Sequence, residues 1–444
     1  MRGWDRPPVT APDGGLVRAV GRWSLAGFML NAILGAGVYG LPSLVAEKLG
    51  AWAWVGVLLT GVAVSTVVAS FAEVSSRFGA TGGPYLYARV AFGSYVALAV
   101  GWLHYLTRLA SAASIANLFV IYLAEFVPGL VGWGAKAVVV SVVFGALAYI
   151  NRRGVEQGAR TSNILIVAKV LPLALFGVGG LIVALSRGSV ATSLEVVPTA
   201  RAWFEALLVL VFAFGGFESG VIALGEAKNP ERDAPFALLL AVLVCTVLYT
   251  LVQAVATLTL ADPSVHPRSV ADAARALVGP AGATFMSVGA LLSMAGWFAG
   301  ATTATPRLTF AMAERGLLPA AFAKLHPRYR TPVLSIVTFA ALSVVLSLSG
   351  GFLSNVTLSV ISRLGIYGVV CSSLIVLRRR DGRDPAVPAA RFRLPGGVGV
   401  ALVGLLLSVA LITRITPREA VIMVIVLGLA SANWVVARRG AFRS

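Results

Sequence analysis

Two apolar segments of this chain are broken by glycine at equivalent places in its two halves. The first is Asn31–Tyr39 (NAILGAGVY) and the second is Phe212–Glu218 (FAFGGFE). In hydrocarbon an unwound backbone is tolerated only where it is buried in protein or lines a cavity, because lipid satisfies no backbone hydrogen bonds. Broken helices at corresponding positions of two halves are typical of the binding site of a secondary transporter. The pattern therefore favours a membrane carrier with its site between the two breaks.

The composition excludes a soluble fold. Hydrophobic residues make up 58% of the 444 residues and charged residues 12%. Repeated apolar runs approach the roughly 20 residues with which a helix crosses a bilayer. We predict an all-α integral membrane protein with twelve transmembrane helices. They lie at residues 24–46, 51–72, 91–124, 134–150, 161–186, 202–225, 235–260, 277–305, 332–350, 355–377, 395–413 and 419–437.

The positive charges indicate how the chain is oriented. The net charge is +18, and with the N-terminus inside, the inner segments hold 25 of the 36 Lys and Arg residues, whereas the outer segments hold eight. Lys and Arg accumulate in cytoplasmic loops. We therefore expect a multi-pass protein of the cell (inner or plasma) membrane with both termini in the cytoplasm. The tract Arg378–Arg380 then anchors this topology, and we expect no nucleic-acid partner.

The predicted organisation is a single membrane domain. Residues 1–23 and 438–444 are expected to be cytoplasmic tails, residues 24–377 a transporter core, and residues 395–437 two further spans, 11 and 12. Spans 1–5 and spans 6–10 each contain an odd number of helices, so the second unit enters the membrane with opposite polarity. The core is thus predicted to be a five-plus-five inverted repeat with broken helices 1 and 6. Apolar periodicity at residues 270–277 predicts a short surface helix.

The two breaks offer a ligand opposite electrical environments. At Gly35–Gly37, the half-helix that follows exposes free N–H groups and the positive end of its dipole, which favour a carboxylate. At the second break, the carbonyl groups of residues 212–215 lack helical partners and favour an ammonium group, and the carbonyls of Ile33 and Leu34 can contribute. Carboxylate and ammonium together describe an α-amino acid. A lone G-x-G more often serves close helix packing, and the matching second break is what favours a site.

Four charged residues fall deep inside predicted spans, where a charge is costly enough to mark a candidate functional residue. They are Arg108, Lys169, Glu218 and Arg363. Lys169 is either a proton carrier or a fixed structural cation, and Glu218 either caps the second half-helix or couples the gate to protonation. The two arginines hold their protons and are expected to be structural, whereas Glu73 is expected at the membrane interface.

Residues for hydrolytic or metal chemistry are missing from the predicted spans. All seven aspartates fall in predicted loops or tails, and His104 is the only histidine inside a span. Cys245 and Cys371 each lie inside an apolar span, where a lone cysteine behaves as a small hydrophobe. We therefore expect no metal site, no cofactor, no disulfide and no enzymatic activity.

Longer motifs surround the two breaks. The first break opens Gly35–Pro42 (GAGVYGLP), and Glu73–Gly93 contains the run GGPYLY. The second break, Phe212–Glu218, is followed by Glu226–Arg232 (EAKNPER). These motifs resemble those of the amino acid-polyamine-organocation (APC) superfamily of permeases, and the resemblance covers almost the whole chain. It implies the five-plus-five inverted-repeat transporter fold, alternating access and amino acid substrates.

Carried over residue by residue, the resemblance puts the substrate carboxylate on amides of the first break and the amine on carbonyls of both breaks. It makes Phe212 an aromatic gate and places Lys169 where sodium-coupled relatives hold an ion, which implies a sodium-independent carrier by proton symport or exchange. Ala36 replaces a serine common in the family, and Trp297 matches a pocket position in some relatives, with core packing as the favoured role. The expected substrate-binding residues are Ile33, Gly35, Ala36, Gly37, Val38, Phe212, Ala213, Phe214 and Gly215, and the expected gating and coupling residues are Phe212, Lys169 and Glu218.

The expected partners are a small-molecule amino acid, the lipid bilayer and co-transported protons. Two alternatives stay open from the residues alone. In the first, the carrier transports a polyamine or another organic amine. In the second, the protein is a receptor that senses an amino acid through the same fold without transporting it.

Overall fold

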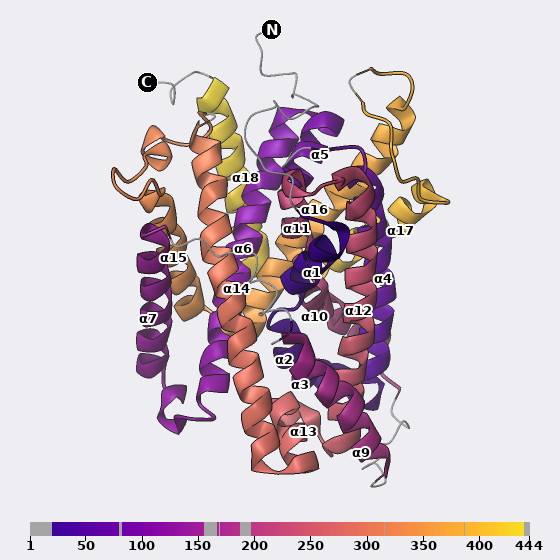
Figure 1. Ribbon diagram of the computed structural model, residues 1–444, viewed down its shortest axis with the longest axis vertical. Coiled ribbons are helices and arrows are strands. Elements are labelled where there is room, and N and C mark those ends of the chain that lie inside the picture. Colours follow the sequence, from indigo (N-terminus) through magenta and orange to yellow (C-terminus); the bar gives the residue numbers. More distant parts are fainter. Residues whose placement is uncertain are drawn as a thin grey trace.

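The computed structural model of the protein describes residues 20–79, 82–154, 167, 169–186, 197–314, 316–385 and 387–438. These residues are almost entirely helical, and the only β-contact among them is an isolated bridge between Val20 and Ala227. The long helices run side by side along the long axis of the molecule (Figure 1). Most of the predicted N-terminal tail, the predicted C-terminal tail after Arg438 and the first part of the predicted fifth span lie outside the described residues.

Ten helical segments of the described chain are long and apolar enough to cross a membrane. They are Arg22–Gly40, Pro42–Ser75, Ser94–Leu123, Trp133–Arg152, Lys169–Ser186, Ala200–Gly220, Pro230–Thr259, Pro280–Glu314, Phe352–Arg380 and Pro417–Arg438. Two shorter apolar helices accompany them, α15 (Val333–Ser349) and α17 (Gly397–Ile412). The prediction of an all-helical membrane protein is confirmed, whereas the number of twelve spans and the inverted repeat stay predictions.

The first predicted break separates three helices. α1 (Arg22–Ile33) ends before Leu34, and α2 (Gly37–Gly40) and α3 (Pro42–Leu49) follow it. Pro42 occupies the first position of α3, where a missing N–H leaves no hydrogen bond unmade. The chain is therefore unwound for three residues in the middle of the molecule, between α1 and α2 (Figure 1).

The second break has the same form. α10 (Ala200–Phe214) ends at Gly215, and α11 (Phe217–Gly220) follows and passes into the 3-10 turn η4 (Val221–Glu226). Gly216, which starts α11, has a φ of 124°, a value that residues with a Cβ rarely adopt. The glycine pair thus ends one half-helix and begins the next.

The remaining helices frame these two. The bounds of the predicted spans agree with them to within about ten residues, and the predicted surface helix at residues 270–277 is α13, which packs its apolar face inward. The helices that surround the two broken ones are α4 (Ala53–Ser75), α5 (Gly83–Phe92), α6 (Ser94–Leu123), α7 (Trp133–Arg152), η3 (Leu175–Gly179, a π-helical turn), α9 (Gly180–Ser186), α12 (Pro230–Thr259), α13 (Ser269–Val278), α14 (Pro280–Glu314), α16 (Phe352–Arg380) and α18 (Pro417–Arg438).

Helix packing places the broken helices at the centre. α4 lies along α12 and α6 lies along α16, while α1 packs on α12 and α10 packs on α4. α7 and α15 form one side of the molecule, and α13 closes its lower end in the view of Figure 1. A single large hydrophobic core connects these helices.

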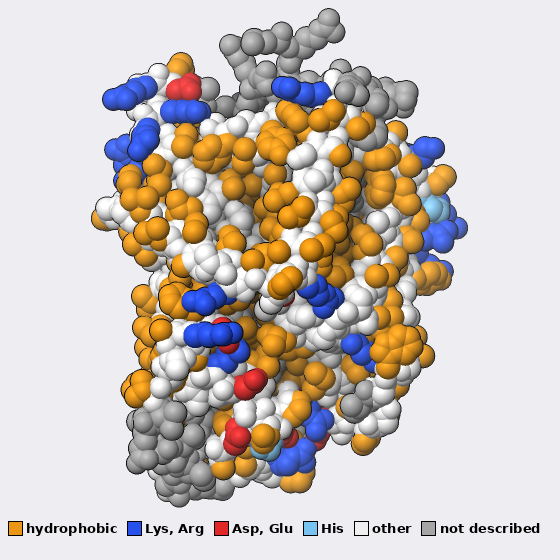
Figure 2. All heavy atoms as spheres, turned by 180° about the vertical axis from the view of Figure 1, so that it is seen from behind, with side chains coloured by type: hydrophobic (Ala, Val, Ile, Leu, Met, Phe, Trp, Pro, Cys, Tyr) orange, Lys and Arg blue, Asp and Glu red, His pale blue; other side chains and the backbone are white. Residues whose placement is uncertain are grey.

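The surface suits a lipid environment. In the most apolar windows of α7 and α18, only 11% of the residues are buried inside the protein. Exposed large hydrophobic side chains include Trp133, Val138 and Val142 on α7 and Val424 on α18. Figure 2 shows hydrophobic side chains over much of the rear face. Membrane lipid can cover such a surface, as expected of a multi-pass membrane protein.

Candidate functional site

The two helix breaks lie directly against each other. A Cβ atom added to Gly37 would stand 2.6 Å from the Cα atom of Ala213, and one added to Gly216 would stand 2.0 Å from the carbonyl oxygen of Ala32. Both distances are too short for a Cβ atom, so a residue with a side chain does not fit at either position. Glycine at each break therefore lets its backbone approach the end of the half-helix at the other break within van der Waals distance.

Three side chains from other helices hold the carbonyl groups of the first break. The Tyr249 hydroxyl of α12 donates to the carbonyl oxygen of Ile33 at 3.2 Å, and the Ser293 hydroxyl of α14 donates to that of Gly35 at 3.3 Å. Between them, Lys169 Nζ donates to the carbonyl oxygen of Leu34 at 3.1 Å. The unwound stretch is thus fixed in place, with its carbonyl groups turned toward these donors.

The amide groups of the same break are free. No acceptor among the described residues meets the N–H groups of Ala36, Gly37 and Val38, although the carbonyl oxygen of Ala36 accepts from Tyr39 and Gly40. Buried amides without partners cost free energy. They therefore favour an acceptor from outside the chain.

A small pocket opens between the two breaks. Six of its lining residues were predicted for the substrate site, namely Ile33, Gly35, Ala36, Gly37, Phe212 and Gly215. The other six lining residues are Gly216 at the second break and five residues of helices distant in sequence, namely Arg108, Ser111, Ile115, Trp297 and Arg363. The lining is therefore more polar and more basic than the two broken segments alone indicate.

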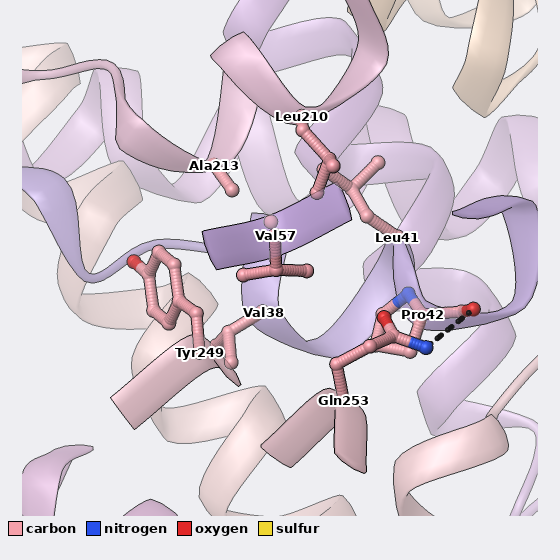
Figure 3. A pocket seen from close by; sticks show the side chains of 9 residues that line it. Val38, Leu41, Pro42, Val57, Leu210, Ala213, Tyr249 and Gln253 are labelled. Carbon is pink, nitrogen blue, oxygen red and sulfur yellow. Dashed lines mark hydrogen bonds between the residues drawn. The ribbon is translucent and has the colours of Figure 1, made fainter. Parts of the chain in front are cut away.

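The other predicted substrate residues face elsewhere. Val38 and Ala213 line a separate, mostly apolar pocket (Figure 3). Gln253 borders this second cavity and donates from Nε2 to the carbonyl oxygen of Pro42 at 3.3 Å. Phe214 is buried and meets the Tyr249 ring edge-on at 5.4 Å. The side chains of Val38, Ala213 and Phe214 therefore pack against the broken helices and do not line the first pocket.

Glu218 is bound on every side. Its Oε2 atom accepts a hydrogen bond from the Gly216 amide at 2.8 Å and one from the Tyr367 hydroxyl at 3.4 Å. Its Oε1 atom pairs with Arg363 Nε at 2.8 Å. Glu218 thus satisfies an amide at the start of α11 and anchors α16 to the second break, which is the capping geometry that the sequence left open beside coupling.

The two buried arginines differ in their partners. The Arg363 guanidinium lies 5.9 Å from the centre of the Phe212 ring, and a Cβ on Gly215 would collide with it. The Arg108 guanidinium lies 4.5 Å over the Trp297 ring. Within the part of the chain that the structure describes, Arg108 makes no hydrogen bond and no ion pair. The sequence singled out both arginines as rare charges within apolar spans, whereas Trp297 was noted only for its match to a pocket position of some relatives, with core packing as its favoured role.

A second polar cluster lies at the ends of α4 and α16, where the Glu73 side chain is fully buried within the protein. Its carboxylate accepts two hydrogen bonds from Arg378, at 2.7 and 2.5 Å, and one from the Leu394 amide at 2.9 Å. Arg77 adds a donor to Asp381 at 3.5 Å. The chain after α16 folds back over the end of α4 and encloses this carboxylate, whereas the location of Glu73 at the membrane interface stays a prediction.

Among the described residues, no group of three or more His, Cys, Asp or Glu side chains lies where it could hold a metal ion. Cys245 and Cys371 are buried and unpaired.

The fold is that of a multi-pass membrane protein, and the pocket between its broken helices is the candidate site. The chain belongs to the amino acid permease family, whose model matches residues 20–435. The members of this family are transporters and not enzymes, and the expected membership of the APC superfamily is confirmed.

Three relatives from Bacillus subtilis illustrate the range of named substrates. The chain is 28% identical to a methylthioribose transporter over 86% of its own length and 84% of the relative's. It is 26% identical to the branched-chain amino acid permease BcaP over 87% and 86%, respectively. It is 27% identical to the serine/threonine exchanger SteT over 86% and 88%.

Proposed function

We propose that this permease is a secondary transporter that moves an α-amino acid across the cell membrane by alternating access. The observation that carries this proposal is the contact between the two helix breaks around one polar cavity. Irregular backbone at the centre of a membrane protein is typical of a substrate site. The relatives named as amino acid permease and amino acid exchanger support the substrate class.

The proposed site divides the amino acid between the breaks. The free amides of Ala36, Gly37 and Val38 bind the α-carboxylate, and carbonyl groups of Ile33, Phe212 and Gly215 bind the amine. Gly35, Ala213 and Phe214 shape the two unwound segments. Because Phe212 is buried and lines the cavity, its ring can serve as the gate.

The contacts between helices support the inverted repeat. If spans 1–5 and 6–10 are equivalent units, α4 corresponds to α12, and the contact of α1 with α12 corresponds to that of α10 with α4. α4 and α12 pack against each other, and the contact of α1 with α12 and that of α10 with α4 both occur. We propose residues 24–377 as the transporter core, residues 395–437 as accessory spans 11 and 12, and cytoplasmic locations for both termini.

The coupling that we propose does not use sodium. Lys169 places an ammonium group on the carbonyl oxygen of Leu34, within the first break. A cation held there competes with a metal ion for the same oxygen. The carrier is then driven by protons or by exchange, and Glu218 links the second break to α16 through Arg363.

Uptake of radiolabelled amino acids into proteoliposomes that contain only this protein tests the proposal. Net flux in this reconstitution separates a carrier from a receptor. Uptake should persist when choline replaces sodium, and strict sodium dependence contradicts the coupling. Methyl esters of the substrate should compete poorly, because they lack the carboxylate charge that the amides of the first break favour.

The methylthioribose transporter among the relatives motivates a second candidate, an uncharged sugar-derived substrate. Inclusion of methylthioribose in the uptake panel decides between the two. A polyamine is disfavoured, because Arg108 lines the cavity without a paired carboxylate among the described residues and repels a cationic substrate.

A further inference from the structure

We propose that Arg108 makes the site selective for amino acids with an acidic side chain, whose second carboxylate pairs with the Arg108 guanidinium. This inference rests on the proposed function and specifies its substrate class. It starts from a buried cation at the cavity that forms no ion pair within the part of the chain that the structure describes.

The first observation is the isolation of Arg108. Its side chain is 8% exposed, and it lines the cavity from α6. In the described chain it has neither a hydrogen bond nor an ion pair, and its one polar contact is with the face of Trp297. Burial of a charge without a partner costs several kcal/mol, so buried charges are normally paired. An arginine in this position is incomplete until an anion enters the cavity.

The second observation is that the nearby carboxylate is already occupied. Glu218 gives one oxygen atom to Arg363 and the other to Gly216 and Tyr367. The charges of Arg363 and Glu218 therefore cancel, and Arg108 leaves the cavity with a net positive charge. A zwitterionic substrate preserves this excess, whereas a substrate with one additional carboxylate neutralises it.

The third observation concerns geometry. The Trp297 ring lies against Gly35, since a Cβ on Gly35 would be 3.4 Å from Trp297 Cδ1, and the Arg108 guanidinium is stacked on that same ring. Trp297 thus separates the backbone of the first break from the cation. Arg363 adds a further donor, because its Nη1 atom is buried without a hydrogen-bond partner among the described residues. One carboxylate on the break and another at the guanidinium groups fit this arrangement.

The test is the ratio of uptake of acids to that of their amides in the purified reconstituted protein. Glutamate and glutamine, and likewise aspartate and asparagine, are matched in shape and differ in the side-chain charge. A charge-assisted contact corresponds to a preference of roughly ten- to a hundredfold for the acid. The Arg108→Gln variant should lose this preference, the Arg108→Lys variant should keep part of it, and the exposed Arg153→Gln variant serves as the matched control.

The outcomes separate this inference from the proposed function. Preference for the acids, lost in Arg108→Gln and kept in Arg153→Gln, supports it. Equal transport of acids and amides by the unaltered protein, or a preference that survives in Arg108→Gln, overturns it and leaves the amino acid carrier intact. Absence of uptake of every amino acid overturns the proposed function instead. If Arg108→Gln does not fold, the ratio measured with the unaltered protein decides.

Discussion

The Lys169 ammonium group hydrogen-bonds the carbonyl oxygen of Leu34, so that a residue of the fifth predicted span holds the unwound backbone of the first. The side chain is 1% exposed, and no carboxylate pairs with it in the described part of the chain. The contact is compatible with two roles of Lys169. It can be a permanent cation that fixes the break, or a proton carrier that releases the break when the ammonium group loses its charge.

Substitution of Lys169 distinguishes these two roles. If Lys169 carries the proton, Lys169→Met and Lys169→Arg should both exchange bound substrate across the membrane but fail to concentrate it, because arginine does not release its proton at accessible pH. The measurement is proteoliposome uptake with and without an inward proton gradient. Rescue of gradient-driven uptake by Lys169→Arg contradicts the carrier role and assigns a structural cation.

Gly37→Ala tests the contact between the breaks. The new methyl group would stand 2.6 Å from the Cα atom of Ala213, and overpacking of this kind typically costs about 1–3 kcal/mol. We expect a lower melting temperature and loss of transport. Gly145→Ala in α7 is the control, because no atom lies within 4 Å of the added Cβ and alanine favours a helix interior by about 0.5–1 kcal/mol. Equal behaviour of the two variants would show that the close approach is unimportant.

Glu73→Gln tests the buried cluster at the ends of α4 and α16. The variant leaves the Arg378 guanidinium without its carboxylate, and breaking a buried ion pair costs about 3–5 kcal/mol. Glu231→Gln is the control, since its pair with Arg391 is largely exposed and such pairs contribute at most about 1 kcal/mol. Thermal unfolding in detergent measures both. A loss in Glu73→Gln no larger than that in Glu231→Gln contradicts the assigned role.

Asp381 gives the same cluster a pH dependence. Burial acts to raise the pKa of Asp381, but the hydrogen bond from Arg393 and the charge of Arg77 outweigh it, so the pKa lies below its ordinary value of 3.8. A depressed carboxylate pKa stabilises the fold above the unfolded-state value and loses this effect as the pH falls through the folded-state value. The stability difference between the unaltered protein and Asp381→Asn should therefore be constant above about pH 5 and shrink below pH 4. A constant difference down to pH 2 argues against the pairing.

The sequence was sufficient for the parts of the fold that local chemistry decides. Glycine pairs and Pro42 locate both breaks, and hydrophobic runs locate the long helices, because in lipid each helix must satisfy its own backbone hydrogen bonds. The bounds of the helices follow less closely. α14, for example, continues to Glu314, beyond the predicted end of its apolar run at residue 305.

The composition of the cavity required the structure. Arg108, Trp297 and Arg363 come from α6, α14 and α16, and only tertiary packing decides that they face the same space. The sequence identified the two arginines as rare intramembrane charges. It did not predict that Arg363 pairs with the Glu218 carboxylate and that Arg108 has no ion pair among the described residues. The partners of Glu73 required the structure for the same reason, since they come from α16 and from the segment after it.

The Glu73–Arg378 pair has a kinetic consequence for a carrier that changes shape. Any opening that separates the ends of α4 and α16 must break this pair in every cycle. In a carrier with alternating access, every 1.36 kcal/mol by which the pair stabilises the closed form over the transition state for opening slows that step about tenfold. The cluster is thus expected to prolong the closed form of this face at the expense of turnover.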